Sequence, residues 1–88
     1  MKTFVVKMDV PKTINNKPMK LADIKSQAQN IAKTNFDDKI IWKEGFIGGV
    51  NTVVLFFMAE DIDIMKDFMD TTKFVVRDIS TLGSIADI

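Results

Sequence analysis

The chain has 88 residues, of which 47% are hydrophobic and 27% are charged, and its 12 basic residues balance its 12 acidic ones. This composition is typical of one folded domain, and the net charge of zero argues against nucleic acid or an anionic membrane as a partner. The sequence contains no Cys, His or Tyr, which excludes disulfides, thiolate metal sites, Cys nucleophiles and histidine-based catalysis or haem ligation.

No segment of the sequence approaches the ~18 consecutive apolar residues of a membrane span. The apolar run that follows Lys2 is too short for the core of a signal peptide. We therefore expect a cytoplasmic protein that has no membrane contact, no bound metal and no cofactor.

The first half of the chain predicts a strand and a helix. Residues 3–10 alternate between apolar and polar side chains, as a half-buried strand does, and Pro11 ends the alternation. A polar loop leads to Pro18, which suits the first turn of a helix. Residues 19–34 then repeat apolar side chains at helical spacing. The predicted core face of this helix comprises Leu21, Ile24, Ala28, Ile31 and Ala32.

The middle of the chain predicts a hairpin. Residues 39–47 alternate again, residues 50–59 are almost entirely apolar, and the Gly48-Gly49 pair between them suits a tight antiparallel turn. On the first strand of this hairpin, one face is expected to carry Ile40, Trp42, Glu44 and Phe46.

A second helix and a fourth strand follow. The predicted core face of this helix comprises Ile62, Met65, Phe68 and Met69. Asp61 or Asp63 suits the N-cap of this helix, and Thr71-Thr72 is expected to end it. We interpret its repeated carboxylates as a cap and a solvated face, not as a metal site. Residues 73–79 predict the fourth strand. The chain then divides into a domain of residues 1–79 and a tail of residues 80–88, which we expect to cover the sheet or to pack on a partner chain.

The resulting order β-α-β-β-α-β predicts an α+β protein with a ferredoxin-like fold, in which both helices cover one face of a four-stranded antiparallel sheet. Residues 50–59 form a central strand of this sheet and are apolar on both sides, so the uncovered face is apolar as well. We expect a second copy to cover it by stacking sheet on sheet. The tail, a ligand or a different protein are the alternatives. The predicted dimer interface comprises Val5, Val54, Phe56 and Met58.

Two segments, residues 40–45 (IIWKEG) and residues 53–61 (VVLFFMAED), carry a resemblance of pattern. A strand with Trp42, a hairpin and an apolar strand that ends in acidic residues resemble the dimeric α+β-barrel superfamily, including its small uncharacterised families. This resemblance implies a homodimer with a pocket between sheet and helices. Some members are oxygenases, haem-handling proteins or isomerases, but the members that rely on haem or histidine are not matched here.

Five residues are candidates for ligand binding. Trp42 and Asn51 are residue types that a cofactor-free oxygenase uses to hold an aromatic substrate, although packing and turn formation explain them more simply. Lys7, Asp9 and Arg77 form a potential charge cluster for a carboxylate or phosphate, or else an ion pair at the rim of the dimer. No residue is assigned a catalytic role.

The leading hypothesis is therefore a non-enzymatic, homodimeric binding or interaction module. The first alternative is a small cofactor-free enzyme or ligand-binding protein whose pocket lies between sheet and helices and takes a small apolar ligand. The second alternative is an RNA-binding domain. The zero net charge and the lack of a basic-Gly-aromatic opening in the third strand argue against it.

Overall fold

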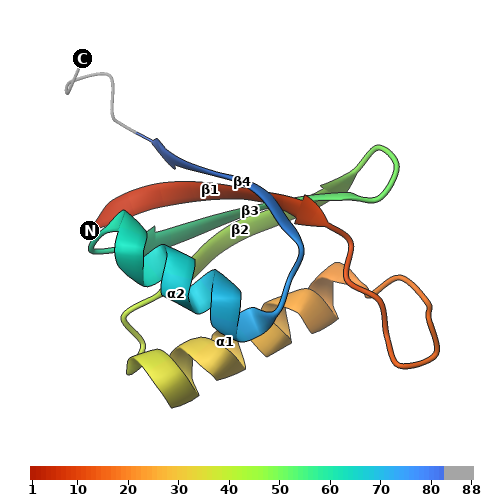
Figure 1. Ribbon diagram of the computed structural model, residues 1–88, viewed down its shortest axis with the longest axis horizontal. Helices are drawn as coiled ribbons and strands as arrows, with labels where there is room; N and C mark the ends of the chain where they lie inside the picture. The colour runs from red at the N-terminus through yellow and green to blue at the C-terminus, as the bar shows by residue number, and fades with distance from the viewer. Residues whose placement is uncertain (83–88) are drawn as a thin grey trace.

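The structure is a computed structural model that describes residues 1–82. Figure 1 shows one layer of strands with both helices on the same side of it. The elements in chain order are β1 (Lys2–Asp9), α1 (Leu21–Phe36), β2 (Ile41–Gly48), β3 (Thr52–Ala59), α2 (Ile62–Thr72) and β4 (Val76–Leu82).

The strands are arranged in the order β2-β3-β1-β4, and every neighbouring pair is antiparallel. The α+β class and the four-stranded antiparallel sheet predicted from the sequence are therefore confirmed. The central pair is β1 and β3, as expected, so the most apolar segment of the chain lies in the middle of the sheet.

The hydrophobic core lies between the sheet and the helices. Alternate residues of β1 and β3 point toward the helices and are buried, which follows from the two-residue period of a strand. The apolar stripes of α1 and α2 meet them, as the helical spacing predicted. The buried residues of these four elements include Phe4, Val6, Met8, Val53, Leu55, Phe57, Ala59, Ile24, Ala28, Ala32, Met65, Phe68 and Met69.

Aromatic rings connect the two layers in a continuous series of edge-to-face contacts. The Trp42 and Phe57 ring centroids lie 5.5 Å apart, and those of Phe57 and Phe68 lie 5.3 Å apart. Phe68 in turn contacts Phe36 at 5.6 Å. Contacts of this kind stabilise a core by about 0.5–1.5 kcal/mol each beyond the area that they bury. These ring contacts connect β2 and β3 with both helices.

The two helices begin differently. Asp61 caps α2, because its Oδ1 accepts a hydrogen bond of 2.9 Å from the backbone N–H of Ile64. Helix α1 has no such side-chain cap at Lys20 and starts two residues later than predicted. Pro18 lies before the helix, in an isolated bridge with Lys12. Helix α2 ends at Thr72, so the Thr71-Thr72 pair ends it as expected.

Strand β2 differs from its prediction because it contains a bulge. Trp42 pairs with Phe57 and Glu44 pairs with Phe56, so Lys43 is an extra residue without a partner on β3. Such a residue shifts the alternation of side chains by one position. Trp42 therefore points toward the helices, whereas Glu44 and Phe46 point away from them. The expectation that these three side chains share a face is wrong.

The last strand and the hairpin also differ from the sequence-based boundaries. Strand β4 extends to Leu82, so residues 80–82, which the sequence placed in the tail, belong to the sheet. The remainder of that tail, residues 83–88, lies outside the described residues. Val50, expected at the start of a strand, lies in the hairpin turn and is 93% exposed.

Candidate functional site

The side of the sheet away from the helices is the surface for which the sequence predicts a dimer interface. We call it the open face. Directly paired residues of antiparallel strands lie side by side on the same face, so the register arranges the open face in rows across the strands. In the order β2, β3, β1, β4 these rows are Ile41, Met58, Thr3, Leu82; then Glu44, Phe56, Val5, Ser80; then Phe46, Val54, Lys7, Asp78; and finally Gly48, Thr52, Asp9.

Apolar side chains gather on β2, on β3 and at the N-terminal end of β1. The predicted interface residues Val5, Val54, Phe56 and Met58 all lie on the open face and are half-buried there. The ring of Phe46 packs edge-to-face against Phe56, with 6.1 Å between the centroids. An apolar surface that spans several strands is typical of an interaction site.

Three further large apolar residues belong to this surface and were not among the predicted interface residues. Ile41, Phe46 and Leu82 are 42%, 54% and 46% exposed. Phe46 was missed because the bulge at Lys43 reverses its direction, and Leu82 was missed because it was assigned to the tail. Ile41 could have been predicted from the alternation of the strand, because its neighbour Ile40 lies on the opposite, buried face.

Charged residues occupy the opposite end of the open face, on β1 and β4. The Arg77 guanidinium donates two hydrogen bonds to Asp9, from Nε to Oδ1 at 2.9 Å and from an Nη to Oδ2 at 2.6 Å. These bonds and the charge of Arg77 hold the pKa of Asp9 below its ordinary value, against a smaller effect of desolvation. The same bonds raise the pKa of Arg77. Two of the three residues of the predicted charge cluster, Asp9 and Arg77, thus form a direct, two-pronged contact.

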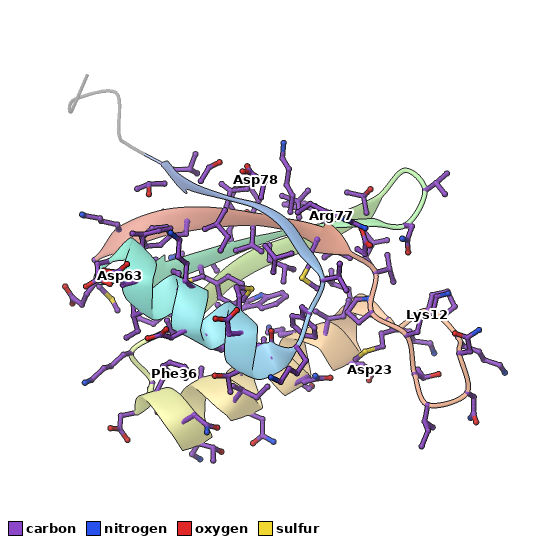
Figure 2. The ribbon with its side chains drawn as sticks, in the orientation of Figure 1. Lys12, Asp23, Phe36, Asp63, Arg77 and Asp78 are labelled. Carbon is purple, nitrogen blue, oxygen red and sulfur yellow. The ribbon has the colours of Figure 1, made fainter. Side chains whose placement is uncertain are left out.

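Lys7 lies beside this pair but does not join it. Its register partner on β4 is Asp78, whose carboxylate accepts a 2.8 Å hydrogen bond from the Ser80 hydroxyl. Figure 2 labels Arg77 and Asp78 on β4, with the helices on the other side of the sheet. Within residues 1–82, the contact between Arg77 and Asp9 is the one ion pair shorter than 4 Å. The structure therefore brings Asp9 and Arg77 together and leaves Lys7 without a close carboxylate among the described residues.

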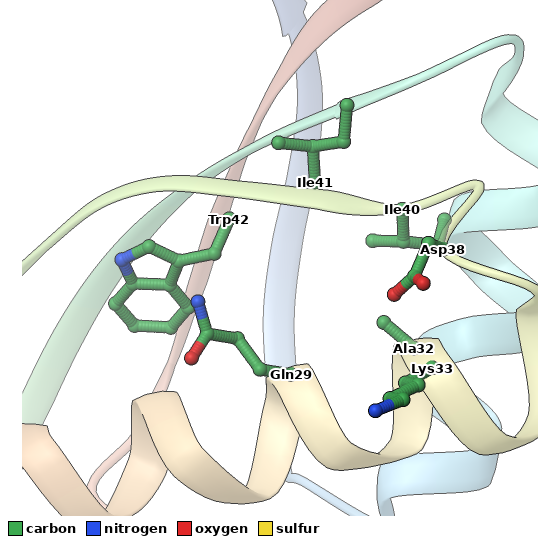
Figure 3. Close-up of a pocket in the computed structure, with 7 residues that line it drawn as sticks. All are labelled: Gln29, Ala32, Lys33, Asp38, Ile40, Ile41 and Trp42. Atoms are coloured by element: carbon green, nitrogen blue, oxygen red, sulfur yellow. The ribbon is translucent and has the colours of Figure 1, made fainter.

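Trp42 lies on the helix side of the sheet, away from Lys7 and Arg77. It borders a cleft of about 300 Å³ between α1 and the start of β2. Figure 3 shows its indole next to the amide of Gln29. A single small ligand therefore cannot contact Trp42 and the charged end of the open face together. The other residues that line the cleft are Ala32, Lys33, Asp38, Ile40 and Ile41.

The position of the Trp42 ring depends on Gly45, which the sequence-based prediction did not single out. A Cβ atom at Gly45 would lie 2.7 Å from the Trp42 ring and 2.9 Å from the side chain of Leu55. Contacts that short require the neighbours to move. The glycine therefore leaves the space in which the indole packs against Phe57.

Asn51 occupies the hairpin turn with a φ of 62°, a left-handed conformation that Asn tolerates better than most residues. Its carbonyl oxygen accepts a hydrogen bond of 3.2 Å from the backbone N–H of Val10. Asn51 also lines, with Asp9 and Lys73, a cleft of about 540 Å³ at the charged end of the sheet. Its backbone geometry supports the simpler interpretation as a turn residue that ties the hairpin to the end of β1.

Comparisons with known proteins add no identification. No protein-family model, no curated protein and no solved structure matches the chain. Within the part of the chain that the structure describes, no three acidic side chains gather as a metal site would require, and neither helix is long and apolar enough to cross a membrane.

Proposed function

We propose that the chain is a non-enzymatic, cytoplasmic interaction module that forms a homodimer by stacking the open faces of two copies. The observation that supports this proposal most directly is the apolar surface of the open face. It combines the half-buried Val5, Val54, Phe56 and Met58 with the exposed Ile41, Phe46 and Leu82. Covering a few hundred Å² of such surface contributes several kcal/mol, at about 25 cal/mol per Å².

The dimensions of the open face suit a second copy. Strands ~4.8 Å apart with a rise of ~3.3 Å per residue make this sheet roughly 19 Å wide and 25 Å long. The projected area of roughly 475 Å² is smaller than the ~800 Å² per partner of standard interfaces, so the proposed dimer lies at the small end of the range of specific interfaces. Sheets pack face to face in many proteins, about 10 Å apart. The net charge of zero also means that two copies do not repel each other as a whole.

The placement of the clefts favours a flat partner over a small ligand. Four clefts bordered by described residues lie along α1, at the charged end of the sheet and beside α2. None of these four is lined by Val5, Val54, Phe56 or Met58. A small molecule is normally enclosed by a concave pocket, whereas a second sheet needs a flat surface.

We further infer that the fold is ferredoxin-like. The order β-α-β-β-α-β, the central antiparallel pair of β1 and β3 and the position of both helices on one side support this assignment. It also accords with the proposed dimer, because neither of the two helices within residues 1–82 covers the second face of the sheet.

The substitution Phe56→Asp tests the proposal. Phe56 lies in the middle of the open face, so a carboxylate there would be desolvated by the partner and would disfavour association. We expect the natural chain to be a dimer at tens of micromolar in sedimentation equilibrium and Phe56→Asp to be a monomer with an unchanged circular dichroism spectrum. Ile14→Asp is the matched control, because Ile14 is fully exposed in a loop, and it should dimerise normally.

Two results would contradict the proposed dimer. One is a natural chain that stays monomeric up to several hundred micromolar. The other is a Phe56→Asp variant that associates as strongly as the natural chain while retaining its fold.

The alternative function is a ligand-binding protein or cofactor-free enzyme that uses the cleft beside Trp42. Its volume of about 300 Å³ lies at the lower end of the range for small-molecule pockets. Thermal stabilisation of the natural chain by a compound from a panel of small apolar ligands, reduced in Trp42→Phe, would favour this alternative.

A further inference from the structure

We propose that Glu44 of one copy forms an ion pair with Lys7 of the other copy, so that two symmetry-related pairs set the orientation of the stacked sheets. This inference rests on the proposed homodimer and names the contacts that make one copy recognise another. It follows from three observations: the position of Glu44, the position of Lys7, and the distribution of apolar residues over the strands.

Glu44 is a carboxylate in the apolar half of the open face. The bulge at Lys43 turns it to this side, opposite Phe56 on β3. Beyond Phe56, its row continues with Val5 and Ser80, neither of which is a cation. Glu44 is exposed. No basic side chain of residues 1–82 lies within 4 Å of its carboxylate.

Lys7 is the corresponding unpaired cation. It lies on β1, next to Val54 of β3, and its side chain is exposed. None of the carboxylates in the described part of the chain lies within 4 Å of its ammonium group. In the part of the open face formed by β2, β3 and β1, each copy therefore presents a free anion, Glu44, and a free cation, Lys7, whereas the unpaired Asp78 lies outside this part on β4. A free anion and a free cation on the same face are the condition for self-complementary pairing.

Stacking the faces without a partner for these groups would be unfavourable. Removing an isolated carboxylate or ammonium group from water costs several kcal/mol, and a partner of opposite charge offsets that cost. An interface formed by the apolar residues around Glu44 therefore needs a cation from the other copy.

The distribution of apolar residues indicates where the two-fold axis runs. Two identical faces stack around an axis that lies in the plane between them. Strand β3 has the most apolar open face, with Val54, Phe56 and Met58. An axis beneath β3, roughly along it, would place β3 on β3 and β2 of one copy over β1 of the other.

This orientation brings the two charges within reach of each other. Rotation about this axis keeps each row at its position along the strands, so Glu44 lies over Val5 of the partner strand, two residues (~6.6 Å) from Lys7. With the sheets ~10 Å apart, the Cα atoms of Glu44 and of Lys7 in the other copy are then roughly 12 Å apart. Extended Lys and Glu side chains of about 6 Å and 4 Å, joined by a hydrogen bond of ~2.8 Å, span this distance. Strand β4, whose open face carries Asp78, Ser80 and Leu82, falls at the rim, where its charge stays hydrated.

A charge exchange between two variants tests the pair. Glu44→Lys presents two cations per face and Lys7→Glu presents two anions, so each variant alone has lost both pairs and gained repulsion. We expect sedimentation equilibrium to show dimer dissociation constants raised at least tenfold for each single variant. An equimolar mixture restores both pairs in a heterodimer and should associate to within about threefold of the natural chain.

Matched controls separate the ion pair from a general effect of charge. Glu60→Lys, in the turn after β3, and Lys25→Glu, on α1, make the same changes at exposed positions outside the open face. They should leave the dissociation constant unchanged, and a mixture of these two controls should behave as each does alone.

The outcomes distinguish the two proposals. If the natural chain dimerises and Phe56→Asp does not, but the mixture of Glu44→Lys and Lys7→Glu forms no heterodimer, the ion pair is wrong and the dimer stands. Single variants that associate as tightly as the natural chain lead to the same conclusion. If the natural chain is a monomer throughout, both proposals fail.

Discussion

The contact between Asp9 and Arg77 joins two residues that are 68 positions apart in the chain, and it anchors the end of β1 to the start of β4. The Arg77 side chain is 66% exposed and that of Asp9 is 28% exposed. Water therefore screens the attraction, and the pair is better understood as a positioning contact than as a major source of stability. Its two-pronged geometry defines the relative direction of the two side chains.

The pair makes the titration of Asp9 depend on Arg77. Because hydrogen bonds from Arg77 lower the pKa of Asp9, we expect Arg77→Gln to raise it toward the ordinary value for Asp, as measured by NMR titration of the carboxyl group. The pKa of Asp9 is lower in the folded state than in the unfolded state, so the contact with Arg77 stabilises the folded protein at pH values above the unfolded-state pKa of Asp9. This stabilisation is lost as the pH falls through the folded-state pKa of Asp9. Lys66→Gln, on α2, is the control. An unchanged Asp9 pKa in Arg77→Gln would show that the contact does not persist in solution.

At the scale of elements, the pairing of β2 determines which of its side chains lie on the open face. Its bulge at Lys43 sends Trp42 toward the helices and Glu44 and Phe46 toward the open face. Gly45 then leaves room for the Trp42 ring against the sheet. Bulge and glycine act together, because the ring that the bulge turns inward occupies the space that the missing side chain leaves.

Gly45→Ala should therefore destabilise the protein. The added methyl group would overlap the Trp42 ring and Leu55, and overpacking of this kind costs about 1–3 kcal/mol. Urea unfolding followed by Trp42 fluorescence measures the effect. Gly48→Ala is the matched control in the same strand, because a Cβ there meets nothing within 4 Å, and it should change the free energy of unfolding by no more than ~0.5 kcal/mol. Equal effects of the two substitutions on the free energy of unfolding would argue against the close packing of the Trp42 ring over Gly45.

At the scale of the whole molecule, a chain of 88 residues forms a small core and has much to gain from association. One layer of helices covers one side of the sheet, and the other side carries the apolar surface described above. A dimer that covers this side would add to the stability of each copy by mass action.

The thermal stability of the natural chain should consequently rise with its concentration. We expect Tm from scanning calorimetry to increase by several degrees between about 5 and 500 µM, because only the folded chain presents the open face. Phe56→Asp should show no such increase. A Tm of the natural chain that is independent of concentration over this range would count against a dimer coupled to folding.

The sequence by itself determined the types and order of the elements, the core faces of both helices and the double-sided apolar character of β3. These properties follow from local patterns, since helical and strand periods are visible in consecutive residues. The absence of Cys and His likewise limited the possible chemistry without reference to the fold. The four predicted interface residues lie together on the open face for the same reason, because strict alternation in β1 and β3 places them there.

Only the tertiary structure decided the direction of Glu44 and Phe46, the inclusion of Leu82 in the sheet and the separation of Trp42 from Lys7. A bulge is defined by the pairing of two strands, so the alternation within one strand does not reveal it. The end of β4 depends on how far β1 continues to offer hydrogen-bonding partners. The open face was thus predictable from its central strands, whereas its edges, including the carboxylate that we propose as a recognition contact, depended on how the strands pair.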